Sequence, residues 1–259
     1  MVDADPIFVY VVGTAGSGKS RFTAGFQRFL KERGIDCVTL NLDPGAEMLP
    51  YQPDVDIRDW IRLSDVMDQY ELGPNGAQIM AADLIALRLG EIEAVLNEFR
   101  GPVVLVDTPG QTELFVFRES GRITMELLAP GRSAIIFLMD PFLAKRPSAF
   151  VSMLMLSATT QFRFQVPLIN VISKRDILKA EELERITSWS EDADALEDAL
   201  VSEKPDLYTQ MTTDAFRVLD AMQGVTKAYA VSGESLEGME DVYGHLEGLF
   251  RAGEDLQSD

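Results

Sequence analysis

The feature that most constrains the fold is an apolar strand that runs straight into a glycine-rich turn. Residues 7–12 read IFVYVV, and continuous apolar runs of this kind are typical of strands covered on both faces in a parallel sheet. The next eight residues, 13–20, read GTAGSGKS and match the pattern G-x-x-x-x-G-K-[ST]. Helical spacing then continues to Leu30. This order of strand, loop and helix predicts a phosphate-binding loop (P-loop).

Such a loop suits a phosphate for physical reasons. Its glycines let the backbone curl around the anion, and the N–H groups at the start of the helix point towards it. Lys19 is expected to bridge the β- and γ-phosphates, and Ser20 to place its hydroxyl on Mg²⁺. The alternative is a strand-to-helix turn without a ligand. The residues of the loop expected to bind nucleotide are Gly13, Ala15, Gly16, Ser17, Gly18, Lys19 and Ser20.

Further apolar runs alternate with stretches of helical spacing. The clearest helical stripe runs from Ile85 to Phe99 and is expected to be either core or a dimer interface. The alternation predicts an α/β fold of the P-loop NTPase class, with a mainly parallel sheet, helices on both faces and inserted helices. The other candidate strands are residues 38–42, 103–106, 134–139, 168–172 and 228–231.

The chain of 259 residues is long enough for one large α/β domain with a full core. We expect a single domain at residues 1–253 and a polar tail at 254–259. Within the domain we expect one insertion at about 44–100, around a Gly-Pro-Asn turn, and a helical insertion at about 141–166. The acid-rich stretch from Glu181 to Lys204 predicts solvated helix.

The charge of the chain excludes several classes of partner. Its 42 acidic and 23 basic residues give a net charge of −19, which would repel nucleic-acid backbones and anionic membranes. Residues 1–6 are acidic and lack the basic region of a signal peptide. No apolar run approaches the about 20 residues that span a bilayer. The expected location is cytoplasmic, with no direct nucleic-acid or membrane binding.

Acidic residues follow two of the predicted strands. Asp107 stands at the carboxyl end of one of them, in the sequence DTPGQ, and is expected to hold the Mg²⁺ shell through water. The N–H of Gly110 can sense a γ-phosphate. Asp43 follows the second strand, so it belongs at the same edge of the sheet. It could orient the attacking water or hold a metal-bound water, or it could simply cap a turn.

The sequence Ser-Lys-Arg-Asp at 173–176 ends a later strand, where GTPases usually carry [NT]-K-x-D. Asp176 is expected to accept hydrogen bonds from guanine N1–H and the exocyclic amine; adenine has an acceptor at N1 and would leave the carboxylate unpaired. The stem of Lys174 can lie over the base. Ser173 is shorter than the usual Asn and could lose a bridge to the P-loop. A backbone N–H at Ser232-Gly233 can contact guanine O6.

Five motifs occur in a defined order: GTAGSGKS, NLDPGAE, GPNGA, DTPGQTE and SKRD. In this order they resemble the GPN-loop GTPases of archaea and eukaryotes, and the archaeal single-form members look most similar. The resemblance covers nearly the whole chain, from Phe8 to about Phe250. On its own, GPN would be an ordinary turn tripeptide.

The resemblance implies a constitutive homodimer. In that family the tripeptide of each subunit enters the partner's nucleotide site, which assigns Gly73, Pro74 and Asn75 a role next to the partner's γ-phosphate. It also implies that Asp43, Gln111 and Glu113 help to position the attacking water and Mg²⁺. The candidate catalytic residues are therefore Asp43, Asn75, Gln111 and Glu113, and the candidate metal-site residues are Ser20, Asp43 and Asp107.

The expected function is Mg²⁺-dependent hydrolysis of GTP to GDP and phosphate by a nucleotide-driven switch or assembly factor. Eukaryotic relatives are linked to RNA polymerase assembly, so the resemblance also implies a protein client. Two alternatives remain open: a P-loop ATPase or kinase, and a GTP-binding assembly factor with negligible turnover. Comparing GTP with ATP binding separates the first alternative, and measuring phosphate release separates the second.

Overall fold

The computed structural model describes residues 6–129, 131–203, 206–222 and 226–255, with side chains as far as residue 250. The chain divides into two compact units, Met1–Ile135 and Ile136–Asp259. The acidic start at residues 1–5, Lys204 and the last four residues of the expected tail lie outside the described residues.

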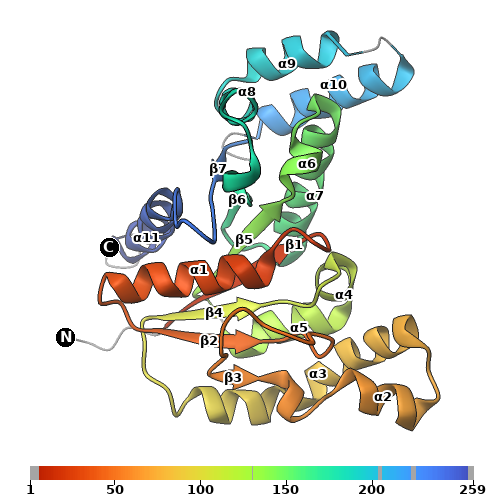
Figure 1. Cartoon of the computed structure of the whole chain (residues 1–259), viewed down its shortest axis with the longest axis vertical. Coiled ribbons are helices and arrows are strands. Elements are labelled where there is room, and N and C mark those ends of the chain that lie inside the picture. The colour runs from red at the N-terminus through yellow and green to blue at the C-terminus, as the bar shows by residue number, and fades with distance from the viewer. Residues whose placement is uncertain (1–5, 130, 204–205, 223–225, 256–259) are drawn as a thin grey trace. The chain divides into compact units, whose positions relative to one another are not determined.

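The first unit contains four strands of parallel sheet in the order β3-β2-β4-β1 (Figure 1). In the register, Val11 of β1 and Asn41 of β2 both lie beside Asp107 of β4. The loops that follow these three strands therefore leave the sheet at one edge, as the sequence predicts. The strands are β1 (Ile7–Gly13), β2 (Cys37–Asn41), β3 (Val55–Asp56) and β4 (Val103–Asp107).

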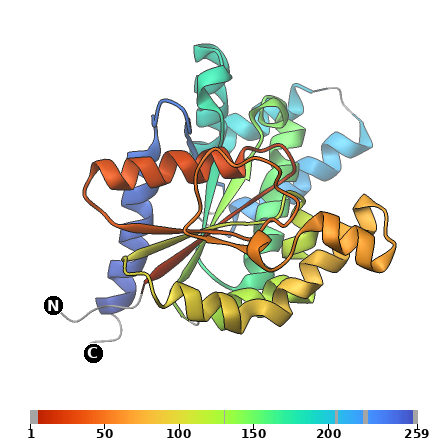
Figure 2. The ribbon, with the colours of Figure 1, turned by 60° about the horizontal axis from the view of Figure 1, so that its bottom comes forward.

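Helices cover both faces of this sheet. Helix α1 (Lys19–Glu32) packs on β1, β2 and β4, whereas α3 (Pro74–Leu96) and α5 (Glu119–Leu128) lie on the opposite face (Figures 1 and 2). The four residues from Val9 to Val12 are fully buried, which explains why their run has no polar alternation. The predicted α/β fold is confirmed in this unit.

The segment expected as an insertion at 44–100 contains β3, a 3₁₀ turn at Ile57–Asp59, α2 (Leu63–Tyr70) and α3. Strand β3 was not predicted, because two residues are too few to show a pattern. In α3, Ile85, Leu89 and Ile92 are buried within the chain, so this part of the apolar stripe is core.

The Gly-Pro-Asn tripeptide begins a helix and is not confined to a turn. Gly73 is the N-cap of α3, Pro74 is its first residue and Asn75 lies in its first turn. Proline fits there because the first helical residue needs no N–H donor inside the helix.

The second unit contains the parallel strands β6 (Leu168–Ile172) and β7 (Ala228–Ala230), and β5 (Ser133–Met139) runs across the boundary between the units. Helices α7 (Pro147–Phe164) and α11 (Met239–Asp255) pack against β6, and α8 (Ala180–Glu191) packs against β7. The remaining helices are α6 (Pro141–Ala144), α9 (Ala193–Val201), α10 (Leu207–Asp220) and a 3₁₀ turn at Arg175–Ile177.

One sequence expectation for this unit needs correction. The acid-rich stretch is not simply a solvated helix, because α8 and α9 bury Ile186, Trp189, Leu196 and Leu200. Helix α11 continues to Asp255, two residues into the segment expected as a polar tail. The helical insertion expected at 141–166 corresponds to α6 and α7. Within the described residues, no helix has both the length and the apolar character that crossing a membrane requires.

The loop that follows β4 is held by a close backbone contact. Helix α4 (Thr112–Val116) meets α5 at Gly121, where an added Cβ would lie 1.8 Å from the carbonyl oxygen of Phe115. Both partners are backbone or Cβ atoms that cannot move aside as a flexible side chain would. Only glycine therefore allows α4 and α5 to pack in this way.

Replacing Gly121 with alanine is expected to destabilise the protein by about 3 kcal/mol, because the extra carbon forces a backbone shift in a packed region. Gly90→Ala is the matched control: Gly90 is exposed in α3, and a Cβ there meets nothing within 4 Å. That change should raise stability by up to about 1 kcal/mol through helix propensity. Urea unfolding of both variants measures the difference, and equal midpoints would contradict the packing argument.

Candidate functional site

Residues 13–20 form the loop between β1 and α1. Gly16 and Gly18 have φ angles of +76° and +93°, a region that residues with a Cβ rarely adopt. No side chain caps the N-terminus of α1. The first N–H groups of the helix are thus not taken by a capping side chain, which suits an anion.

Lys19 is the main cation of this site. Its Nζ donates to three carbonyl oxygens, those of Gly13 at 2.9 Å, Thr14 at 3.3 Å and Gly110 at 2.7 Å. Burial lowers the pKa of Lys19, while the charges of Asp107, Asp43 and Glu113 act in the opposite direction. All three donors of the ammonium are therefore used within the protein, and a phosphate must displace one or more carbonyls to reach it.

Asp107 lies at the end of β4 and is 1% exposed. Its Oδ2 accepts a hydrogen bond of 3.0 Å from the hydroxyl of Tyr51. Its Oδ1 is buried and has no hydrogen bond of regular geometry among the described residues, although the nearby Ser20 hydroxyl lowers the pKa. Burial is the larger effect and raises the pKa of Asp107 to about 6.

These residues fit a hard cation. An unsatisfied carboxylate oxygen beside a hydroxyl is the oxygen chemistry that Mg²⁺ prefers. No group of three or more His, Cys, Asp or Glu side chains in the described part of the chain could hold a metal alone. Ser20 and Asp107 would therefore share Mg²⁺ with phosphate oxygens and water, as is usual for this ion.

Asp43 bridges two loops. Its Oδ1 accepts from the N–H of Gly45 and its Oδ2 from the N–H of Gly110, both at 2.9 Å. Burial raises the pKa of Asp43, opposed by these two N–H groups and by Lys19. Asp43 thus accepts a hydrogen bond within its own turn and also contacts the loop after β4. The N–H of Gly110, predicted to sense a γ-phosphate, is occupied by this carboxylate.

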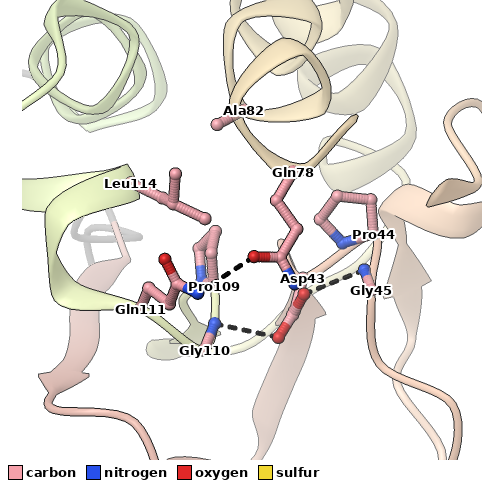
Figure 3. A pocket seen from close by; sticks show the side chains of 9 residues that line it. All are labelled: Asp43, Pro44, Gly45, Gln78, Ala82, Pro109, Gly110, Gln111 and Leu114. Atoms are coloured by element: carbon pink, nitrogen blue, oxygen red, sulfur yellow. Dashed lines mark hydrogen bonds between the residues drawn. The ribbon is translucent and has the colours of Figure 1, made fainter. Parts of the chain in front are cut away.

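A cavity of about 70 Å³ lies beside this contact (Figure 3). It is lined by Asp43, Pro44, Gly45, Gln78, Ala82, Pro109, Gly110, Gln111 and Leu114. Since one water needs about 10–15 Å³ in this measure, the cavity has room for a few waters but is too small for a nucleotide. Gln111, the residue before α4, donates from Nε2 to Oε1 of Gln78 at 3.1 Å. Glu113 is exposed in the first turn of α4.

The Gly-Pro-Asn motif is not part of this cavity. Gly73, Pro74 and Asn75 are all exposed, and none of them is among the lining residues. Within the described chain, the motif therefore presents an open surface at the start of α3.

The second unit contains the residues predicted to bind a base. The carboxylate Oδ1 of Asp176 accepts from the Ser232 hydroxyl at 2.6 Å, and a carboxylate oxygen has room for a second donor. Lys174 has a φ of +53°, and its ammonium contacts Asp140 at 2.9 Å. The Ser173 hydroxyl donates to the carbonyl of Met139 at 3.2 Å. Gly233 is half-buried next to Ser232. Asp176, Lys174 and Ser232 thus meet in one loop cluster.

Three residues with a part in the geometry were not predicted. Tyr51 donates to Asp107, Thr108 donates to the carbonyl of Val11 at 2.7 Å, and Gln78 contacts Gln111. Tyr51 and Gln78 lie in loop or helix segments without a motif, so no local signal identifies them. Thr108 lies within DTPGQ and could have been chosen from that motif.

Together, the strand–loop–helix unit, the lysine at the helix start and the aspartate at the end of a neighbouring strand define a P-loop nucleotide-binding protein. Comparison with known proteins narrows this class. A family described as "conserved hypothetical ATP binding protein" matches residues 11–252. A GPN-loop GTPase of Pyrococcus abyssi is 31% identical over 238 residues, which cover 91% of this chain and 94% of that protein.

The chain belongs to the GPN-loop GTPase family. The crystal structure of a Pyrococcus abyssi GTPase in its apo form matches with a TM-score of 0.82 and 30% identity, covering 94% of this chain and 97% of that one. GPN-loop GTPase 1 of Dictyostelium discoideum is 28% identical over 241 residues, and the matched part is 92% of this chain but 60% of that protein. Members named in this way are hydrolases that act on GTP.

Asp107→Asn is expected to stabilise the nucleotide-free protein at pH 7.5 in EDTA by up to about 3 kcal/mol, since a pKa raised from 3.8 to about 6 makes the buried charge costly. The parent binds more protons when folded, so its stability falls as pH rises from about 4 through 6. The advantage of the variant should therefore shrink as pH falls through this range.

Thermal or urea unfolding at pH 5 and pH 7.5 measures the effect. Asp68→Asn, an exposed aspartate of α2, is the control and should change little. A pH-independent difference, or a variant that is less stable at pH 7.5, would contradict the burial argument.

Proposed function

We propose that this protein hydrolyses GTP to GDP and phosphate in a Mg²⁺-dependent reaction and works as a homodimeric switch or assembly factor. The observation that carries the proposal is the junction at Gly110, whose C=O accepts from Lys19 and whose N–H donates to Asp43. A γ-phosphate competes for both the ammonium and the N–H. Family membership supports GTP as the nucleotide.

Different residues of the first unit bind the phosphates, hold Mg²⁺ and orient the attacking water. The N–H groups of the P-loop and Lys19 bind the phosphates and offset their charge. Mg²⁺, when bound by Ser20 and Asp107, supplies additional charge neutralisation on the phosphate oxygens. When a γ-phosphate takes the N–H of Gly110, the Asp43 carboxylate loses one donor and becomes a better acceptor for a water proton. Gln111 and Glu113 supply further polar groups that orient this water.

Guanine is assigned to the cluster in the second unit. The carboxylate of Asp176 matches the N1–H and exocyclic amine of guanine, and the contact with Ser232 holds that carboxylate in one orientation. The aliphatic stem of Lys174 covers the base. One backbone N–H at Ser232-Gly233 is assigned to O6; that of Ser232 donates to the carbonyl of Glu237 at 3.0 Å, so the N–H of Gly233 is the one assigned. An adenine base would place its N1 acceptor against the carboxylate and be repelled.

The Gly-Pro-Asn motif acts in trans in this proposal. The exposure of Asn75 at the start of α3 supports a role at a second subunit, since its side chain is accessible to a partner. An amide placed at the γ-phosphate stabilises the charge that develops in the transition state. Asparagine is neutral and stabilises less than an arginine, so turnover is slow. A protein client, by analogy with the RNA polymerase assembly linked to eukaryotic relatives, completes the proposal.

The direct test is phosphate release by the purified protein with GTP or ATP, in Mg²⁺ or EDTA. The proposal expects release from GTP only, and only with Mg²⁺. Faster release from ATP, or transfer of the phosphate to an acceptor, would favour a P-loop ATPase or kinase, in line with the "ATP binding" description of the matching family. Tight GTP binding without release would favour an assembly factor that uses GTP as a structural ligand.

Asp176→Ala is expected to weaken GTP binding about 10- to 100-fold, because hydrogen bonds to a charged group contribute about 1.5–3 kcal/mol. Inosine triphosphate lacks the exocyclic amine, so it should bind the parent more weakly than GTP does. The variant should bind the two nucleotides with the same affinity. Calorimetry measures all four affinities. Asp220→Ala, an exposed aspartate in α10, serves as the control. If the variant still prefers GTP over the inosine nucleotide, Asp176 does not read the base.

Asn75→Ala is expected to slow hydrolysis about 100-fold while GTP affinity stays within about twofold, because the lost donor acts mainly on the transition state. Mixing this variant with Lys19→Ala tests action in trans. Each variant alone should have about 1% of parental activity or less. Random exchange of subunits should restore about a quarter of parental activity, since half of the dimers would carry one complete site. No recovery after verified exchange would mean that Asn75 acts within its own chain or not at all.

A further inference from the structure

Gln78 connects the helix that begins with the Gly-Pro-Asn motif to the loop after β4. It is the fifth residue of α3, one turn beyond the motif, and its Oε1 accepts the hydrogen bond of 3.1 Å from Nε2 of Gln111. Figure 3 shows its side chain reaching down from α3 towards Gln111 and Asp43. Gln78 and Gln111 are the two side-chain amides in the wall of the cavity next to the Asp43–Gly110 contact.

The contact determines which end of the Gln111 amide is free. A glutamine amide has two donors on nitrogen and an acceptor oxygen. With Nε2 directed to Gln78, Oε1 of Gln111 is left as an acceptor. An attacking water must donate a proton to an acceptor so that its lone pair can face the phosphate. The hydrogen bond to Gln78 therefore leaves the Oε1 acceptor of Gln111 for a water molecule.

A second contact holds α3 to the same stretch of chain. Arg118, the N-cap residue of α5, binds Asp83 of α3 through two hydrogen bonds, at 2.8 Å and 2.5 Å. This bidentate ion pair keeps α3 in place relative to residues 111–118. The ion pair therefore helps to hold Gln78 near the loop, in addition to the single, exposed hydrogen bond between Gln78 and Gln111.

We propose that Gln78 is a positioning residue for GTP hydrolysis: it orients the amide of Gln111 towards the attacking water and couples that amide to the helix that carries Asn75. The inference rests on the proposed function. Any shift of the start of α3, such as docking of Gly73–Asn75 on a partner, moves Gln78 and hence Gln111. One helix thus serves the partner's site through Asn75 and its own through Gln78.

The expected effect is moderate, because a single neutral hydrogen bond contributes about 0.5–1.5 kcal/mol, or about 3- to 10-fold in rate. Gln78→Met keeps the length of the side chain and removes the acceptor. We expect kcat to fall about 3- to 10-fold in this variant, with KM and the affinity for GTP unchanged. A general packing defect would instead alter affinity and stability.

The test is a double-mutant cycle with Gln111→Ala, measured by single-turnover GTP hydrolysis and by GTP binding. If Gln78 acts through Gln111, Gln78→Met has no further effect in the Gln111→Ala background. Gln78→Ala repeats the measurement with a smaller side chain. Gln52→Met, an exposed glutamine of the same unit outside the cavity, is the matched control and should match the parent.

Two outcomes overturn the inference while leaving the proposed function intact: Gln78→Met hydrolyses GTP as fast as the parent, or its loss is equal with and without Gln111. A parent protein that binds GTP without hydrolysing it overturns the proposed function and this role together. Unchanged GTP affinity in both Gln78 variants shows that they are folded, so a slower rate reports on positioning.

Discussion

The hydrogen bonds of the Lys19 ammonium connect the P-loop to the loop that follows β4. A buried cation needs acceptors, and Lys19 finds them in two carbonyls of its own loop and in that of Gly110. Gly110 follows β4, which lies beside β1 in the sheet, so the contact joins the loops of neighbouring strands. Asp43, after β2, binds the same residue through the Gly110 N–H, which belongs to the preceding peptide group.

The polar groups at this junction have hydrogen-bond partners within the protein. Lys19 and the Gly110 N–H are both engaged, so neither is left as an uncompensated buried group. One carboxylate oxygen of Asp107 differs, because it is buried without a hydrogen bond of regular geometry among the described residues, and such an oxygen suits a hard cation. A magnesium-bound nucleotide would bring a cation to Asp107. Its phosphate oxygens would replace protein carbonyls as acceptors for Lys19. Binding would then loosen Gly110 from its two protein partners, which is a direct physical route from the nucleotide to the loop.

Helix α3 contacts the same loop through Gln78. Its buried stripe anchors it in the core, its first turn exposes Asn75, and Gln78 touches the loop next to Gly110. The long apolar face, which could have been either core or interface from the pattern alone, is core at Ile85, Leu89 and Ile92. The first turn of the helix, where the motif lies, is exposed.

The sequence alone determined the elements that depend on local periodicity and on glycine. The apolar strands, the P-loop, the acid at the end of β4 and the family were readable because each is a run or motif within a short window. The six predicted strands were placed within a residue or two, whereas β3 was missed because two residues show no period. Likewise the buried faces of α8 and α9 depend on what packs against them.

Only the tertiary structure decided how the motifs contact one another. Tyr51 and Asp107, Asp43 and Gly110, and Gln78 and Gln111 are separated by 56, 67 and 33 positions. The first two pairs meet because parallel strands bring their following loops to one edge, and the third because α3 packs beside α4 and α5. Periodicity specifies which residues are buried along one element, but not which side chains from different loops fall within hydrogen-bond distance. That choice depends on strand register and helix packing, which follow from the fold as a whole.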